Sequence, residues 1–178
     1  MNTQPFHHPM ITLQLLAAID PHRAALAKLL IDCVHSGASV GFVPPLAEHE
    51  ALAYWDGVAA DMRSGGRLLL VAMQGDDLVG AVQLSLCGKK NGLHRAEVEK
   101  LMVHTAHRRQ GIGHALVQRI EQMAHDQGRT LLILDSRSDD MASGLYLKRG
   151  FIEAGRIPGY ALSAAGTLEG TTYFYKGV

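Results

Sequence analysis

The segment that most constrains the fold is a glycine-containing turn between an apolar run and an amphipathic helix. Leu101, Met102 and Val103 form the run, and Arg108-Arg109-Gln110-Gly111-Ile112-Gly113 follows after a short gap. Glycine lets a turn approach a ligand closely, and the first N–H groups of a helix have no partners within it. The helix dipole adds about half a positive charge there. This order of elements predicts a site for an anion such as a phosphate.

The spacing of the glycines excludes two common phosphate-binding loops. A Walker loop needs Gly-x-x-x-x-Gly-Lys-Ser/Thr, and a dinucleotide fingerprint needs a third glycine where Leu116 stands. Taken alone, the segment is equally compatible with an ordinary strand-to-helix turn. A second motif, about thirty residues further on, favours the functional interpretation.

That second motif is the pattern A-x-x-L-Y-x-K-x-G-F between Ala142 and Phe151, in which a helix carries Tyr146 and Gly150 ends it. Together with the earlier Arg-x-x-Gly-x-Gly, it resembles the GNAT superfamily of N-acetyltransferases. The resemblance implies an α/β domain with a central mixed, mostly antiparallel sheet flanked by helices. It also implies acetyl-coenzyme A as co-substrate. In one departure, Asp139 stands where the family often has asparagine.

The predicted acetyl-coenzyme A site has two parts. The turn at residues 108–114 would hold the pyrophosphate, with Arg108 favoured as a phosphate contact by its place in the signature. The pantetheine arm would then extend back along the preceding strand and pair with its backbone. The predicted cofactor residues are Leu101, Met102, Val103, Arg108, Arg109, Gln110, Gly111, Ile112, Gly113 and His114.

Apolar periodicity predicts how the rest of the chain is organised. Asp20-Pro21 is expected to cap a first helix with a buried stripe of Leu26, Leu29, Leu30 and Cys33, and a second helix ends at residues 64–66. A third helix covers residues 111–127. Strands are expected at residues 11–15, 67–73, 78–87, 94–103, 131–135, 151–157 and 171–175. Strands 67–73, 78–87 and 94–103 should be antiparallel neighbours. Strand 131–135 should be buried on both faces and parallel to strand 94–103.

Length and composition bound the class of protein. A chain of 178 residues, 47% apolar and 19% charged, fits one soluble domain over residues 1–178. A formal net charge of zero argues against nucleic acid or anionic membrane as partners. No apolar run reaches about 18 residues, and residues 1–8 are polar without a signal-peptide core, which predicts a cytoplasmic protein. The spacing of His104, His107 and His114 matches no standard zinc site, so no metal is expected.

Acetyl transfer to an amine requires a base, and three acidic residues are candidates: Glu97, Glu99 and Asp135. At about 3.3 Å per residue, Glu99 would lie near the thioester and Glu97 about 7 Å further toward the acceptor. We favour Glu97 acting through a water, with Asp135 at the end of the neighbouring strand sharing the role. Glu99 shares the face of Glu97 unless a bulge reverses the parity. Each acid could instead be solvent-facing charge.

The remaining chemistry needs a donor for the departing thiolate, and the resemblance assigns this duty to Tyr146, which would otherwise be a core tyrosine. Neither Cys33 nor Cys87 lies in a nucleophile setting, so direct attack in a ternary complex is the preferred mechanism. Two alternatives stay open, a protein N-acetyltransferase and a non-catalytic acyl-coenzyme A sensor. The sequence leaves the oligomeric state open, a homodimer included.

Several further segments resemble one branch of the superfamily, the tabtoxin resistance acetyltransferases. They are residues 37–42, 83–87, 91–98 and 158–160. The resemblance implies a small-molecule primary amine as acceptor, namely the amino group of a β-lactam amino-acid toxin.

Overall fold

The computed structural model describes residues 10–178, so the polar start at residues 1–8 lies outside the described residues. The strands are β1 (Ile11–Leu15), β2 (Arg67–Gln74), β3 (Asp77–Leu86), β4 (Arg95–Val103), β5 (Leu131–Arg137), β6 (Ile152–Leu162) and β7 (Leu168–Gly177). The helices are α1 (Arg23–His35), α2 (Glu48–Arg63), α3 (Ile112–Asp126) and α4 (Met141–Lys148), with short 3-10 turns η1 (Asp20–His22), η2 (Lys90–Gly92) and η3 (Thr105–His107).

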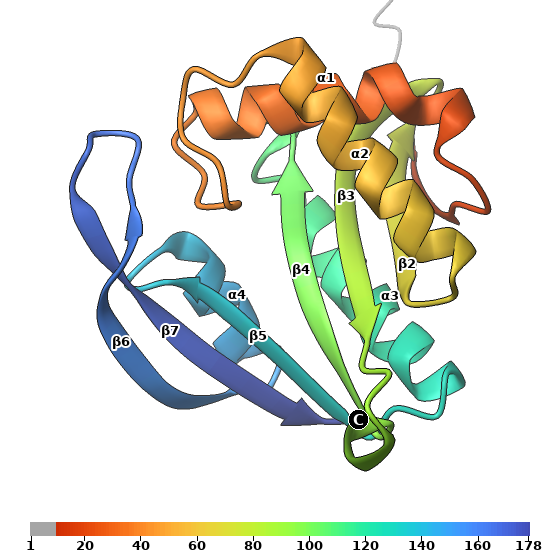
Figure 1. The fold of residues 1–178 in the computed structure, drawn as a ribbon, viewed down its shortest axis with the longest axis vertical. Helices are drawn as coiled ribbons and strands as arrows, with labels where there is room; N and C mark the ends of the chain where they lie inside the picture. The colour runs from red at the N-terminus through yellow and green to blue at the C-terminus, as the bar shows by residue number, and fades with distance from the viewer. Residues whose placement is uncertain (1–9) are drawn as a thin grey trace, which may run out of the picture.

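The strands form one sheet in the order β1-β2-β3-β4-β5-β7-β6 (Figure 1). Every neighbouring pair is antiparallel except β4 and β5, which are parallel. The α3 crossover between these two strands explains the parallel pairing, because parallel neighbours need a long connection. The predicted mixed, mostly antiparallel sheet is therefore confirmed.

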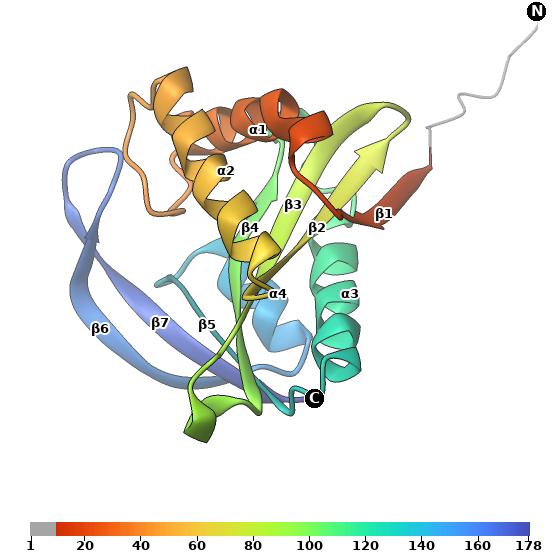
Figure 2. The same cartoon turned by 45° about the vertical axis from the view of Figure 1, so that its right-hand side comes forward.

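Helices cover the two faces of the sheet unequally. α1 and α2 lie over β2, β3 and β4, and α3 lies on the opposite face (Figures 1 and 2). Neighbouring residues of β2 alternate between the two cores, so Leu69 packs toward α1 and α2 while Leu70 packs toward α3. The predicted stripe of α1, including Leu26 and Cys33, is buried in the first core.

Two details of the expected elements are wrong. Asp20 caps no helix, because it is itself the first residue of η1, and α1 begins only at Arg23. Strand β5 is not buried on both faces, since Leu132 and Leu134 are buried but Asp135 is exposed. The physical reason is that no residue of β5 belongs to the core under α1 and α2. That face of β5 is left open.

The sheet opens between its two parallel strands. β4 and β5 pair only over Arg95–Glu97 and Leu131–Ile133, and beyond those pairs β4 contacts β3 and β5 contacts β7 (Figure 1). Strands that separate leave backbone N–H and C=O groups without partners on the facing edges. The edge of β4 after Glu97 is therefore free to pair with an extended ligand.

A bulge interrupts β4 where this free edge begins. The pairing with β3 moves from Ala81↔Met102 to Gln83↔Glu99, so β4 contains one extra residue there. Lys100 takes the left-handed conformation, with φ of 52°. The bulge follows Glu99, so the alternation between Glu97 and Glu99 is not reversed and both side chains lie on the same face.

The last two strands form a hairpin longer than expected. β7 inserts between β5 and β6, which leaves β6 as the outer edge of the sheet. All but one of the side chains of β6 are exposed, and its register with β7 shifts twice, after Glu153 and after Ile157. The hairpin rises beside the β4–β5 opening (Figure 2).

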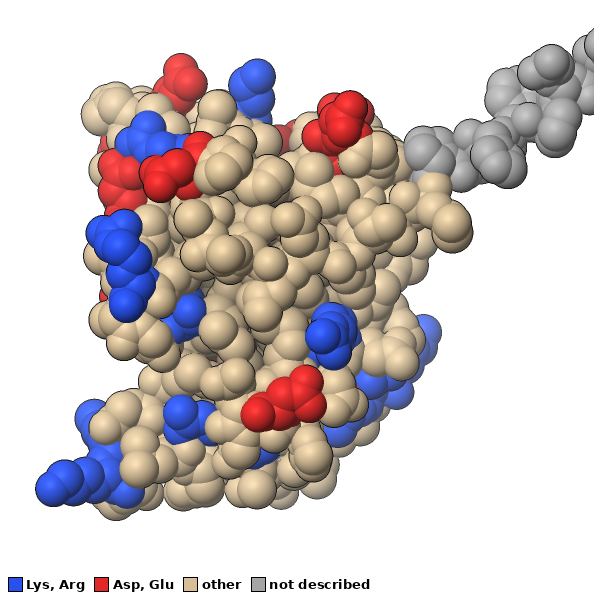
Figure 3. Space-filling view, turned by 90° about the vertical axis from the view of Figure 1, so that its right-hand side faces the viewer, with Lys and Arg blue, Asp and Glu red and all other residues tan. Residues whose placement is uncertain are grey.

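Charge on the surface is mixed in sign. On the face shown in Figure 3, Lys and Arg lie in separate groups with Asp and Glu among them, and uncharged side chains fill the centre. Among residues 10–178, no helix is long and apolar enough to cross a membrane.

Candidate active site

The turn before α3 has the backbone conformation that the glycine motif predicts. Arg109 and Gly111 both have positive φ, 62° and 80°, and Gly111 stands at the N-cap of α3. No side chain caps this end of the helix. The N–H groups of its first turn therefore lack intrahelical partners and are open to an anion.

Helix α1 holds this turn in place. Arg108 donates from Nε to the Val103 carbonyl (3.1 Å) and from Nη2 to Ser36 Oγ (2.7 Å). Asp32 accepts from the backbone N–H and the hydroxyl of Thr105, both at 2.8 Å. Asp32 and Ser36 were missed by sequence reasoning because they lie some 70 residues before the motif. Part of the Arg108 guanidinium is thus engaged by the protein itself.

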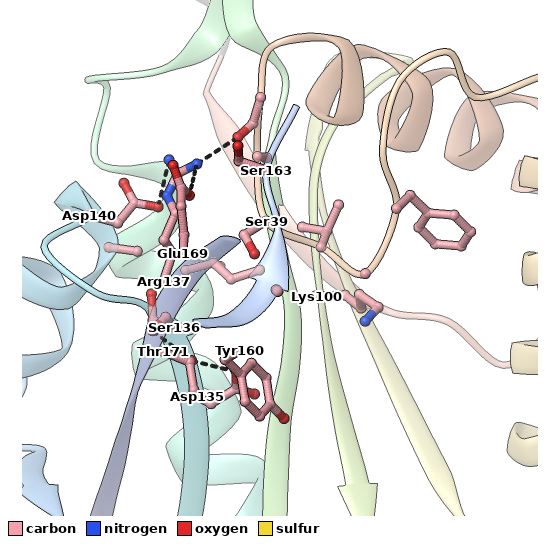
Figure 4. A pocket seen from close by; sticks show the side chains of 18 of the residues that line it. Ser39, Lys100, Asp135, Ser136, Arg137, Asp140, Tyr160, Ser163, Glu169 and Thr171 are labelled. Carbon is pink, nitrogen blue, oxygen red and sulfur yellow. Dashed lines mark hydrogen bonds and ion pairs between the residues drawn. The ribbon is translucent and has the colours of Figure 1, made fainter. Parts of the chain in front are cut away.

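A cavity of about 330 Å³ lies where β4 and β5 have separated (Figure 4). The loop after α1, the bulge of β4, the end of β5, α4 and the β6–β7 hairpin all contribute to its walls. Of the predicted site residues, Leu101, Asp135 and Tyr146 line the cavity. Glu97, Met102, Val103 and residues 108–114 do not.

Glu97 nevertheless lies within electrostatic reach of the cavity. Burial, followed by the negative charges of Glu99 and Asp135, raises the pKa of its carboxyl above the usual range. Among residues 10–178, Glu97 makes no hydrogen bond or ion pair. Glu99 differs, because its carboxylate pairs with Arg67 Nη1 at 2.8 Å. Glu97 is thus the acid on β4 whose oxygens are available.

Asp135 faces the cavity from β5. Its Oδ2 accepts a hydrogen bond from Thr171 Oγ1 at 2.8 Å. Its partner across the ladder is Tyr173, whose hydroxyl hydrogen-bonds to that of Tyr160 at 2.9 Å. Among the described residues no cation pairs with Asp135, so its negative charge is directed at whatever occupies the cavity.

Tyr146 belongs both to the core and to the cavity wall. The residue is 5% exposed, and its ring packs against Phe151 and Phe174 at centroid distances of 5.7 and 6.0 Å. Burial, followed by the charges of Asp135 and Asp140, raises the pKa of the phenol above its usual value. The hydroxyl is therefore protonated at neutral pH.

Arg137 organises the upper wall of the cavity and was not anticipated from the sequence. Its guanidinium bridges Glu169 (3.3 Å) and Asp140 (3.6 Å) and donates to the Gly37 carbonyl at 3.1 Å (Figure 4). It lies two residues after Asp135, on the same face of β5. This two-residue spacing from Asp135 is the sequence feature that could have identified Arg137.

The cysteines and histidines stand apart from the cavity. Burial raises the pKa of the Cys33 thiol to about 11. A hydrogen bond from the Lys89 backbone, helped by Arg95, lowers that of Cys87. Neither lines the cavity. Within residues 10–178, no three His, Cys, Asp or Glu side chains are grouped as metal ligands.

Comparison with known proteins identifies the family. The model of the acetyltransferase (GNAT) domain matches residues 30–158. The chain belongs to the GNAT acetyltransferase family. In this GNAT protein, Asp139, at the position where asparagine is frequent, is exposed and pairs with Arg156 at 3.2 Å.

Individual relatives agree with this family. N-acetyltransferase 8F1 of Rattus norvegicus is 36% identical over 88 residues, which cover 48% of this chain and 40% of that protein. The chain spans less than half the length of the curated relatives that it matches.

Solved structures share the fold of this GNAT protein. The protein yncA of Salmonella typhimurium, solved with its cofactor acetyl-CoA, superposes with a TM-score of 0.77 at 20% identity, over 94% of this chain and 93% of its own. The ribosomal-protein-alanine N-acetyltransferase of Brucella melitensis gives 0.80 at 20% identity, over 94% and 99%. At this level of identity the likeness concerns the fold alone.

Proposed function

We propose that this GNAT protein transfers the acetyl group of acetyl-CoA to the primary amine of a small molecule, by direct attack in a ternary complex. The observation that carries the proposal is the opening between β4 and β5. An uncapped helix N-terminus lies beyond the end of β4, and a cavity with unpaired acidic groups nearby lies where the strands separate. A phosphate-bearing thioester and an amine are the ligands that suit these two ends.

The cofactor would lie along the free edge of β4. The pyrophosphate is assigned to the N–H groups of residues 108–114 and to Arg108, and the pantetheine arm to the backbone of Leu101, Met102 and Val103. Bound acetyl-CoA supplies an acyl group activated as a thioester. The bulge at Lys100 interrupts the regular pairing with β3 where the acyl group would enter the cavity.

Glu97 and Asp135 are assigned to the amine proton. An alkyl ammonium has a reference pKa of about 10.4, so a carboxylate must accept its proton before the nitrogen can attack. Glu97, whose pKa is raised by burial, accepts this proton through a water, and Asp135 holds the ammonium at the cavity wall. The nitrogen then forms a bond to the acetyl carbon as the carbon–sulfur bond breaks.

Tyr146 is assigned to the sulfur. Its hydroxyl has no hydrogen-bond partner among the described residues, and the residue lines the cavity. A thiol has a reference pKa of about 8.5, below the reference value of about 10 for tyrosine, and the pKa of Tyr146 is raised further. Tyr146 therefore stabilises the departing thiolate by donating a hydrogen bond, and water completes its protonation.

The size of the cavity favours a small acceptor. About 330 Å³ is at the lower end of the range for small-molecule sites, and the loop after α1 and the β6–β7 hairpin both border it. A protein acetyltransferase would need an open groove there. The resemblance to the tabtoxin resistance acetyltransferases favours the amino group of a β-lactam amino-acid toxin, and hence detoxification.

The test is to incubate the purified protein with acetyl-CoA and separate sets of small amines, peptides and the β-lactam toxin. Release of free thiol and the mass of the acetylated product are followed together. Acetylated small amines support the proposal, and turnover of peptides alone supports a protein acetyltransferase. Calorimetric binding of acetyl-CoA without turnover of any acceptor would leave only a sensor of acyl-coenzyme A.

A further inference from the structure

The charged side chains that line the cavity are mostly neutralised by one another. Glu99 pairs with Arg67 at 2.8 Å, and Arg137 is shared between Asp140 and Glu169. The remaining two, Lys100 and Asp135, form no ion pair with any of residues 10–178. One is a cation on β4 and the other an anion on β5 (Figure 4).

The backbone places Lys100 at the cavity with some strain. Its φ of 52° puts a non-glycine residue in the left-handed region, which costs about 1–2 kcal/mol. Strain of this kind persists where the surrounding structure holds it, and it clusters at functional sites.

The loop after α1 leaves room for the ammonium of Lys100. A Cβ added to Gly41 would lie 3.2 Å from Lys100 Nζ, which is closer than most Cβ atoms in proteins come to a neighbouring heavy atom. Gly41 itself has a φ of 85°, which suits glycine and strains other residues. The chain thus keeps space around an ammonium that has no hydrogen-bond partner in residues 10–178.

We propose that Lys100 is a specificity-determining residue that binds an anionic group, such as a carboxylate, of the same acceptor whose amine is acetylated. The inference rests on the proposed function. Lys100 on one wall and Asp135 on the other complement a molecule with both charges. A dication would be repelled by Lys100, and a dianion by Asp135. A protein lysine carries no carboxylate of its own, so the pair also favours small acceptors.

The experiment compares acceptors that differ only in this anionic group. L-lysine is paired with L-lysinamide and L-alanine with L-alaninamide, and kcat/KM is measured for each with saturating acetyl-CoA. Three variants are used: Lys100→Gln, Lys100→Arg, and Lys90→Gln as a matched control on exposed η2. Glutamine keeps an unbranched polar side chain, one atom shorter, and the left-handed penalty of Lys100, but removes its charge. Ratios between variant and wild type cancel the different reactivities of the amines.

For the carboxylates, Lys100→Gln should lower kcat/KM by about 10- to 100-fold, the usual effect of a hydrogen bond to a charged group, with no such loss for the amides. Lys100→Arg should retain most activity, and Lys90→Gln all of it. An equal loss for carboxylates and amides, or a weakened affinity for acetyl-CoA, would overturn the assignment. If no amine is acetylated, the proposed function fails as well. If amines are acetylated without this discrimination, the inference alone fails.

Discussion

The two ends of the opening between β4 and β5 are formed by different kinds of chemical group. The proposed cofactor end would bind through backbone groups of consecutive residues, with Gly111 at the N-cap of α3. The proposed acceptor end is the cavity, lined by side chains from five separate segments, among them Lys100 and Asp135. Backbone recognition suits a ligand that stays the same throughout a family, whereas side chains can change with the acceptor. Substitutions at one end should therefore leave the function of the other end unchanged.

The largest effect is expected at the acceptor end. Glu97→Gln and Asp135→Asn should each lower kcat by about 100- to 10,000-fold, the range for a lost proton acceptor, while the affinity for acetyl-CoA is unchanged. If both act through one water network, the double variant should lose less than the sum of the two free-energy losses. The measurement is steady-state kinetics with calorimetry of cofactor binding, and Glu48→Gln on the exposed start of α2 is the control.

Full activity of both single variants at neutral pH would remove these acids from the mechanism. Glu99 would then be the next candidate, despite its pairing with Arg67.

At the cofactor end, Gly111→Val should weaken acetyl-CoA binding by about 10- to 100-fold. Valine disfavours a φ of 80° by about 1–3 kcal/mol, so the free turn would relax and binding would have to restore it. Gly128→Val is a matched control, because Gly128 has a φ of 67° just beyond the other end of α3 and an added Cβ there would also meet open space.

Calorimetry should therefore separate the two glycine variants. Equal cofactor affinity in both would place the pyrophosphate elsewhere.

Tyr146→Phe tests a residue at the junction of the two ends. It removes one hydroxyl and keeps the packing against Phe151 and Phe174, so stability should be retained. We expect kcat to fall by about tenfold, the low end for one hydrogen bond to a charged group, because a phenol with a raised pKa donates a hydrogen bond to the thiolate rather than a full proton. Tyr175→Phe on β7 is the control, and near-normal turnover of Tyr146→Phe would make this residue purely structural.

The pH profile gives a more graded effect. A protonated Glu97 cannot accept the amine proton, so the rate should fall as pH drops through its pKa, by about tenfold per unit below it. Burial raises this pKa, so the acid limb should lie above the range of an exposed glutamate. In Glu97→Gln the rate should fall less steeply as the pH drops. Both proteins are measured with the same acceptor, so the titration of its amine affects both profiles equally. An identical limb in both proteins would contradict the assignment.

The smallest effect concerns the support of the cofactor turn. Ser36→Ala removes the hydroxyl that accepts from Arg108 at 2.7 Å, and one such hydrogen bond contributes about 0.5–1.5 kcal/mol. Acetyl-CoA binding should weaken about threefold while acceptor KM is unchanged. Ser64→Ala at the end of α2 is the control, since the Ser64 hydroxyl donates to the Asp61 carbonyl as that of Ser36 donates to the Cys33 carbonyl. A change in acceptor KM would show that α1 serves the other end.

Most of the fold could be predicted from the sequence because its signals are local. The apolar stripe of α1 and the glycine that ends α4 each lie within a few residues of what they determine. Burial is not local, which explains why β5 was expected to be covered on both faces. Its outer face is open because α1 and α2 lie over other strands.

The candidate site divides in the same way. The glycine turn was found as a motif, but Asp32 and Ser36 come from a distant helix and left no signal near it. Lys100 did leave a signal in the sequence. In a regular strand residue 100 would share the buried face of Val98, so a lysine there interrupts the apolar alternation of β4. The single-domain extent over residues 1–178, the roles of the site residues and the cytoplasmic location stay predictions.

The irregular outer strand has a consequence for how this molecule behaves at high concentration. A straight, unpaired strand is a template on which other chains can add and aggregate. β6 is poorly suited to that, since it shifts register twice, contains Pro158 and carries the ion pair of Glu153 with Arg156. Proline removes a ladder donor, and shifts bend the edge away from a flat partner. The longest strand of the sheet, β6, is thus an exposed edge. Its irregularity disfavours both fibrils and dimers formed by extending the sheet.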